Sequence, residues 1–365
     1  MFHRIASLSS CLFVSGLLVA GGCGGNKETP ETVAPTSGNT PTGSATSASP
    51  GKKPRVAYIT NGVASFWVIA EKGAKDAGEK FNADVTVDMP HGIDDQKRMV
   101  EDLLTRGVDG FAISPIDPKN QTSMIDQAAE KTKVITQDSD APKSKRLAYV
   151  GVDNYVAGRM CGKLVKEALP GGGKLAIFVG RLEQDNARLR RQGVIDELMD
   201  RTSDSSRYDA PGAEIKGAKY TIVTTLTDQF DQAKGKANAE DAISRYPDLA
   251  GMVGLFAYNP PLCLEALNRS GKVGKIKLIG FDEADETLQA IKDGKCYGTV
   301  VQNPYMYGFE SVRILTALAN GDNSALPKGG FLDIPARQIR KDNVDAFWAD
   351  LKKKVGTKTE APAKK

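Results

Sequence analysis

The sequence predicts an α/β protein that has two doubly wound parallel sheets, one in each of two lobes. From Arg55 onward, short β-rich runs alternate with amphipathic stretches. Strict β–α alternation indicates parallel sheets joined by right-handed crossovers and covered by helices on both faces. About a dozen strand-like runs are too many for one such sheet, and a chain of 365 residues is long enough for two domains.

The elements of the first half follow from apolar spacing. We expect strands over 56–60, 84–88, 110–114, 133–137 and 147–152, and helices over 66–81, around 99–104 up to Gly107, and over 124–131. In the second half we expect strands over 175–179, 220–226, 252–256, 277–281 and 297–301, with helices over 186–199 and 232–245. Residues 201–217 are rich in Ser, Asp, Pro and Gly, so we predict a surface loop there.

The N-terminus predicts export and a tether. Residues 1–22 have a basic start, a short apolar run and small residues, which is typical of a signal peptide. Cys23 follows directly and resembles the lipidated cysteine of a bacterial lipobox, although an ordinary signal peptide with an incidental cysteine is the alternative. Residues 23–53 are mostly Gly, Ser, Thr, Pro and Ala and predict a flexible stalk, and 356–365 predict a disordered tail. We therefore expect a protein anchored by lipid in the periplasm or on the outer cell surface.

Composition excludes several classes of protein. A net charge of +4 is too weak for a nucleic-acid binder. The remaining cysteines (Cys161, Cys263 and Cys296) have no metal-type spacing, so we expect buried residues, at most one disulfide, and neither metal nor cofactor. His91 is the only histidine after the signal, and Gly-x-Ser-x-Gly, P-loop and dinucleotide patterns are absent from the sequence, so we expect no enzyme.

Polar and aromatic residues follow the predicted strands, where ligands of open α/β sheets bind. The candidates are Phe66, Trp67, Asp138, Arg188, Phe230, Asn259, Asp282 and Gln302, with Asn61, Ser139 and Asp140 as further contacts. A sugar hydroxyl both donates and accepts hydrogen bonds, so carboxylates, amides and Arg suit it, and aromatic rings cover its C–H faces. The pattern predicts a small polyhydroxylated ligand.

Each candidate also has a structural alternative. Phe66 shares the apolar stripe of its helix, although two adjacent aromatics are not expected to face one core. For Asp138 and Asp282 the structural alternative is that they cap helices. Arg188 has Arg190 and Arg191 beside it, which also fits a solvated basic face.

Residues 53–355 resemble the periplasmic ribose-binding protein family, the sugar-binding components of ABC importers. The resemblance rests on the order and spacing of these segments: 59–67, 106–115, 151–154, 186–188, 238–242, 280–282 and 298–302. It implies that Phe66, Trp67 and Phe230 hold the ligand and that Asp138, Arg188, Asn259, Asp282 and Gln302 contact its hydroxyls. Ala64 and Ser139 depart from the ribose binders, which have Asn and Arg there, so ribose itself does not follow.

The resemblance also implies a three-segment hinge near Asp153, Asn303 and Leu332. The first lobe would be 55–152 plus 303–331, and the second 153–302 plus 332–355. We expect a monomer that closes on a monosaccharide or polyol and delivers it to an ABC permease. A tethered sensor serving a chemoreceptor or kinase, or a binder of a nucleoside or autoinducer-like furanose, remains an alternative. A sugar-responsive repressor would need a helix-turn-helix where this chain has its signal and stalk.

Overall fold

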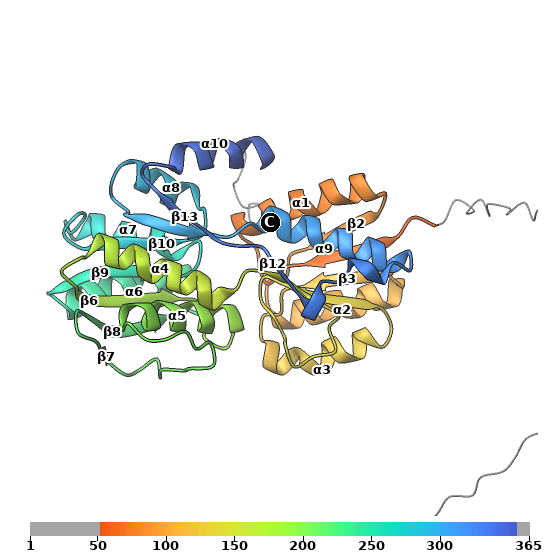
Figure 1. Cartoon of the computed structure of the whole chain (residues 1–365), viewed down its shortest axis with the longest axis horizontal. Coiled ribbons are helices and arrows are strands. Elements are labelled where there is room, and N and C mark those ends of the chain that lie inside the picture. The colour runs from red at the N-terminus through yellow and green to blue at the C-terminus, as the bar shows by residue number, and fades with distance from the viewer. Residues whose placement is uncertain (1–51, 356–365) are drawn as a thin grey trace, which may run out of the picture. The chain divides into compact units, whose positions relative to one another are not determined.

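The computed structural model describes residues 52–355, which form two β-sheets with helices packed against them (Figure 1). The predicted signal peptide, Cys23, nearly all of the stalk, and the tail lie outside these residues. The two sheets confirm the predicted α/β class with two parallel-sheet lobes.

The first sheet has six strands in the order β12-β5-β4-β3-β1-β2, and all of them are parallel. Its strands are β1 (Arg55–Ile59), β2 (Asp84–Asp88), β3 (Gly110–Ile113), β4 (Lys133–Gln137), β5 (Tyr149–Gly151) and β12 (Phe331–Asp333). The helices of this lobe are α1 (Ser65–Phe81), α2 (Ile93–Arg106), α3 (Pro118–Ala129) and α9 (Pro304–Ala319). Because α9 contacts β1, β3 and β4, a segment late in the chain completes the first lobe.

The second sheet has seven strands in the order β13-β11-β10-β9-β6-β8-β7. Its strands are β6 (Gly173–Val179), β7 (Ile215–Lys216), β8 (Tyr220–Thr227), β9 (Leu249–Gly254), β10 (Lys277–Phe281), β11 (Gly298–Val301) and β13 (Arg337–Arg340). The helices are α4 (Asn154–Ala168), α5 (Asp185–Leu198), α6 (Gln232–Arg245), α7 (Asn259–Arg269), α8 (Asp285–Lys292) and α10 (Val344–Val355). The edge strands β7 and β13 are antiparallel to their neighbours, which the prediction of purely parallel sheets missed.

The chain passes between the sheets in three segments. The first lies between β5 and α4, and the second between β11 and α9. The third lies at 334–336, since β12 (Phe331–Asp333) still pairs with β5 of the first sheet. A crossing near Leu332 was therefore placed slightly too early, because a three-residue edge strand has too few residues to give a sequence signal.

Two local predictions also need correction. Helix α3 begins at Pro118 rather than near 124, because the Asp117 carboxylate accepts a hydrogen bond from the Asn120 amide at 3.1 Å and caps the helix. The predicted surface loop over 201–217 ends in the short strand β7, where Ile215 and Lys216 pair with β8. Hydrophobic spacing could reveal neither feature, because one depends on a polar cap and the other on pairing with a distant strand.

Cys161, Cys263 and Cys296 are buried free thiols, as expected for small core residues. Burial raises the pKa of Cys296 to about 12, which keeps this thiol protonated and unreactive. Within residues 52–355, none of the helices is long and apolar enough to cross a membrane.

Candidate ligand-binding site

Two aspartates occupy corresponding positions at the carboxyl ends of strands in the two sheets. Asp138 directly follows β4 of the first sheet, and Asp282 directly follows β10 of the second. Both have a left-handed backbone, with φ of 57° for Asp138 and 65° for Asp282, which few residues other than glycine adopt. Neither is the N-cap of a helix, since α8 is preceded by Ala284 and β4 leads into a loop, so the alternative of helix caps is wrong.

Arg190 lies between these two carboxylates. Its Nη2 is 3.8 Å from the Asp138 Oδ1, and its Nη1 is 4.0 Å from the Asp282 Oδ2. Its Nε donates to the Asn154 Oδ1 at 2.8 Å and its Nη1 donates to the Leu255 carbonyl at 3.1 Å. The Nη2 has no hydrogen-bond partner among the described residues, although Arg190 is only 1% exposed. A buried guanidinium with one free donor marks a place that a ligand oxygen can occupy.

Asp138 collects donors from both lobes. Its Oδ2 accepts hydrogen bonds from Ser114 at 3.1 Å, from Asn61 at 3.4 Å and from Asn186 at 3.3 Å. Ser114 and Asn61 belong to the first lobe, whereas Asn186 belongs to α5 of the second, so this carboxylate joins the lobes. Burial raises the pKa of Asp138 to about 6, and the positive charge of Arg190 opposes that rise.

Asp282 is held by the segment that leads back to the first lobe. The Gln302 Nε2 donates to its Oδ1 at 2.7 Å, and the Gln302 Oε1 accepts from the Tyr307 hydroxyl at 3.1 Å. All three side chains are buried. Burial raises the pKa of Asp282, against the opposing effects of Arg190 and Gln302. Gln302 therefore fixes the orientation of Asp282.

The paired aromatics at the start of α1 share one apolar cluster. Phe66 is 7% exposed and Trp67 is 4% exposed, and both pack in the same hydrophobic core. Their ring centroids lie 4.8 Å apart with planes at 90°, an edge-to-face contact. Contrary to the prediction, these adjacent aromatics therefore do face one core, because perpendicular rings pack side by side.

A second cluster forms around Asp228, which the sequence argument passed over in favour of its neighbours. Its Oδ1 accepts from the Tyr258 hydroxyl at 2.5 Å and from the Phe230 amide at 2.9 Å, and its Oδ2 accepts from Asn259 at 3.0 Å. The Phe230 ring packs against Phe256 at 5.7 Å. The guanidinium of Arg190 lies 5.3 Å from that Phe256 ring, which links the two clusters. The signal that could have found Asp228 is its place directly after β8.

Other predicted contacts lie differently from what was expected. The Arg188 Nη2 pairs with Asp185 at 2.6 Å and its side chain is 31% exposed. Arg190 and Arg191 are each 1% exposed, so the alternative of a solvated basic face is wrong for both. Asp140 is held by Arg146 through two contacts of 2.5 and 2.6 Å, so its carboxylate is occupied within the first lobe.

Two further buried polar side chains have unsatisfied groups. Ser139 follows Asp138 in the chain, and Gln184 directly precedes α5. Neither the Ser139 Oγ nor the amide atoms of Gln184 have a partner among the described residues, and both side chains are 0% exposed. Ser139 was predicted as a contact, whereas Gln184 was not, since one Gln in a loop gives no periodic signal.

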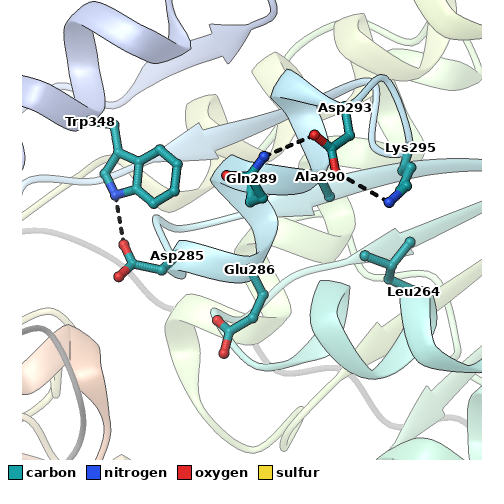
Figure 2. Close-up of a pocket in the computed structure, with 8 residues that line it drawn as sticks. All are labelled: Leu264, Asp285, Glu286, Gln289, Ala290, Asp293, Lys295 and Trp348. Carbon is teal, nitrogen blue, oxygen red and sulfur yellow. Dashed lines mark hydrogen bonds and ion pairs between the residues drawn. The ribbon is translucent and has the colours of Figure 1, made fainter.

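A surface hollow lies elsewhere. It measures about 450 Å³ and is lined from α8 and α10 by Asp285, Glu286, Gln289 and Trp348, among others (Figure 2). The Trp348 Nε1 donates to Asp285 at 2.7 Å, and Gln289 donates to Asp293 at 2.8 Å. None of the predicted site residues lines this hollow, so it does not compete with the cluster around Arg190.

Two parallel-sheet lobes present acidic, basic, amide and aromatic groups from the carboxyl ends of their strands, and Asp138 and Arg190 meet from opposite lobes. Across residues 52–355, no group of three His, Cys, Asp or Glu side chains is placed to hold a metal ion. This is the architecture of a two-lobed binder of small solutes.

The chain belongs to the periplasmic binding protein domain family, whose model matches residues 56–323. It is 30% identical over 248 residues to the ribose import binding protein RbsB of Bacillus subtilis, covering 67% of this chain and 74% of that protein. It is 26% identical to the D-ribose/D-allose-binding protein of Pseudomonas aeruginosa, over 81% of this chain and 92% of that one. These relatives confirm the predicted resemblance, and they are binding proteins rather than enzymes.

A solved structure agrees with this assignment. The ABC transporter solute-binding protein of Burkholderia graminis, in complex with D-arabinose, superposes with a TM-score of 0.72 at 30% identity. The match covers 80% of this chain and 96% of that one. The fold class is therefore that of the periplasmic sugar-binding proteins, a family whose name implies export to the periplasm.

Proposed function

We propose that this protein is the substrate-binding component of an ABC importer and that it captures a monosaccharide or related small polyol between its two lobes. The observation that carries the proposal is the free Nη2 of buried Arg190, which stands between carboxylates from both sheets. The relatives that import ribose and the arabinose-bound neighbour support a sugar as the ligand.

The distances around Arg190 suit a hydroxyl group. Separations of 3.8 and 4.0 Å are too long for hydrogen bonds between the guanidinium and the two carboxylates. A ligand hydroxyl accepts from the guanidinium and donates to a carboxylate, so one such group satisfies both partners. A ligand that contacts both lobes stabilises the arrangement in which the lobes lie together, by its differential affinity for that state.

We propose that Arg190 contacts the ligand and that Asp138 and Asp282 accept hydrogen bonds from its hydroxyl groups. Phe66, Trp67 and Phe230 pack against its ring. Gln302 and Asn259 donate to Asp282 and Asp228, so their role is to hold these carboxylates as well as to face a ligand. Arg188, Asn61 and Ser139 remain proposed contacts at the edge of the site. Asp140 fits a structural role beside Arg146 better.

The identity of the sugar depends on two substitutions. Ala64 and Ser139 replace the Asn and Arg of ribose binders, which removes two contacts to ligand hydroxyls. The unsatisfied Ser139 hydroxyl and Gln184 side-chain amide offer different contacts. We therefore infer a monosaccharide-sized ligand without assigning ribose. Lipidation at Cys23, a monomeric state and docking to an ABC permease complete the proposal.

A thermal-shift panel of pentoses, hexoses, deoxy sugars, polyols and nucleosides tests the ligand class. We expect at least one sugar or polyol to raise the melting temperature, since a ligand at a hundred times its Kd adds about 2.7 kcal/mol to stability. Stabilisation by nucleosides alone, or by none of the compounds, would overturn the sugar assignment. Uptake of the labelled sugar by cells that lack this protein then distinguishes import, where uptake falls, from sensing, where it does not.

A further inference from the structure

A small cavity lies beside Glu283, where residues of both lobes meet. It measures about 20 Å³, which is room for one water molecule. Ile69 of α1 and Tyr305 of α9 line it from the first lobe, and Arg337 and Phe347 line it from the second. Because two lobes supply its walls, any rotation of one lobe against the other changes this cavity.

Glu283 is the buried acid in this cavity. It is 5% exposed, and neither of its carboxylate oxygens has a hydrogen-bond partner within residues 52–355. Its neighbour in the chain is Asp282, the proposed hydroxyl acceptor. An ionised carboxylate without partners is among the most costly groups to bury, so in this arrangement Glu283 is more stable with a proton.

The charges around Glu283 do not compensate for its burial. Arg337 lines the cavity but stacks on the Phe347 ring at 5.2 Å, and Lys354 pairs with Asp350 at 2.8 Å. Arg190, the remaining cation, lies between Asp138 and Asp282. Ile69, Pro304 and Tyr305 line the cavity from the first lobe, and all three are uncharged. The Tyr305 hydroxyl donates a hydrogen bond to Asp76 at 2.8 Å rather than to Glu283.

Two adjacent buried carboxyl groups with little positive charge to share favour one proton between them. Asp282 accepts from Gln302 and lies 4.0 Å from Arg190, so it is the better place for the negative charge. Burial and then the charge of Asp282 raise the pKa of Glu283 well above its ordinary value, with Arg337 and Arg190 opposing. Glu283 is thus the group that holds the proton.

We propose that Glu283 is a positioning residue that takes up one proton when the lobes come together, and so keeps Asp282 ionised for the ligand. The inference rests on the proposed sugar-binding function. When the lobes separate, water reaches the cavity and Glu283 ionises in the ordinary way. When they close, a solvent proton adds to a Glu283 oxygen, and sugar binding is thereby coupled to proton uptake.

Titration calorimetry of the full protein with the sugar found in the panel, at about pH 7.5 in two buffers of different ionisation enthalpy, measures this proton. At that pH Asp138, with a pKa of about 6, is mostly ionised and adds little. We expect an uptake of about one proton per sugar for the wild type and of none for Glu283→Gln. This variant mimics the neutral acid and should bind more tightly than the wild type, because closure no longer requires a proton.

Asp350→Asn is the matched control, because Asp350 lines the same cavity and loses the same charge but is exposed on α10. It should take up as many protons as the wild type. Equal uptake by Glu283→Gln and wild type, or no uptake by the wild type, would overturn this inference alone. If the wild type shows no heat of sugar binding, the proposed function is overturned instead.

Discussion

Asp138 and Asp282 take the same left-handed conformation at the ends of equivalent strands in different sheets, and the Arg190 guanidinium lies between them at 3.8 and 4.0 Å. A non-glycine residue with positive φ costs conformational energy, so its occurrence at both positions fits a functional requirement. Asp138 reaches Asn186 and Arg190 of the other lobe, whereas Asp282 contacts Arg190 and Gln302.

Substituting Arg190 and Arg188 one at a time should distinguish their contributions to sugar binding. We expect Arg190→Gln to weaken sugar binding by about 30-fold or more, since loss of a buried charged hydrogen bond costs about 2–3 kcal/mol. Arg188→Gln should stay within about threefold, because Arg188 is partly exposed and pairs with Asp185. Titration calorimetry on variants checked for folding by circular dichroism measures both. A larger loss for Arg188→Gln would place the ligand at the other arginine.

Sugar affinity should depend on the ionisation of Asp138. The pKa of Asp138 is about 6, and a ligand hydroxyl that donates to this carboxylate needs it ionised. In the Glu283→Gln background, where Glu283 takes up no proton, we expect affinity to be constant above about pH 7 and to fall, by up to tenfold per unit, below about pH 6. Binding measured from about pH 4.5 to 8 tests this. Asp138→Asn should bind weakly with a flat acid profile, and an unchanged acid limb in that variant would exclude Asp138.

The same shift predicts the opposite sign for stability without ligand. The pKa of Asp138 is raised in the folded state, so its stabilising contribution is present below about pH 4 and is lost as pH rises through about 6. Asp138→Asn should therefore stabilise the ligand-free protein at pH 7 by about 1–3 kcal/mol, and add nothing near pH 4. Urea unfolding at the two pH values measures the difference. Destabilisation at pH 7 would mean that the ionised form is the favoured one.

Loop 201–217 should depend on Asp196. This buried carboxylate accepts from the Tyr155 hydroxyl at 2.8 Å, and pairs with Arg207 at 2.7 Å and with Arg201 at 3.3 Å. We expect Asp196→Ala to lower the free energy of unfolding by about 2–4 kcal/mol, because it leaves several donors without a partner. Sugar affinity at low temperature should stay within about threefold.

The control for this loop is Asp204→Asn. Asp204 is 43% exposed and lies 3.8 Å from Arg207, so its loss should cost less than about 0.5 kcal/mol. Equal unfolding free energies for the two variants would show that Asp196 does not fasten the loop.

The close packing of α4 on α5 should position Arg190. A Cβ added at Gly158 would lie 2.1 Å from the Arg190 carbonyl oxygen, so the two helices must move apart. We expect Gly158→Ala to destabilise the protein by about 2–3 kcal/mol and to weaken sugar binding. Gly171→Ala is the matched control, since nothing lies within 4 Å of its Cβ. Unchanged sugar affinity in a folded Gly158→Ala protein would show that the packing of α4 on α5 does not position Arg190.

The fold followed from the sequence to a large extent. Apolar periodicity is local, so the strands over 84–88, 133–137 and 277–281 were predicted with their observed ends. Strict β–α alternation then led to two parallel sheets. The antiparallel edges β7 and β13 escaped prediction because they have two and four residues and depend on distant partners.

Local spacing predicts the two parallel-sheet lobes, the acids Asp138 and Asp282 after their strands, and the kind of ligand that such groups suit. Which of three nearby arginines lies beside those acids depends on the packing of distant segments. Arg188, Arg190 and Arg191 differ little in sequence, but the packing of α5 against α4 and the sheet turns Arg190 inward between the lobes and leaves Arg188 at the edge. A contact between lobes depends on how distant segments pack, and local spacing carries no information about that.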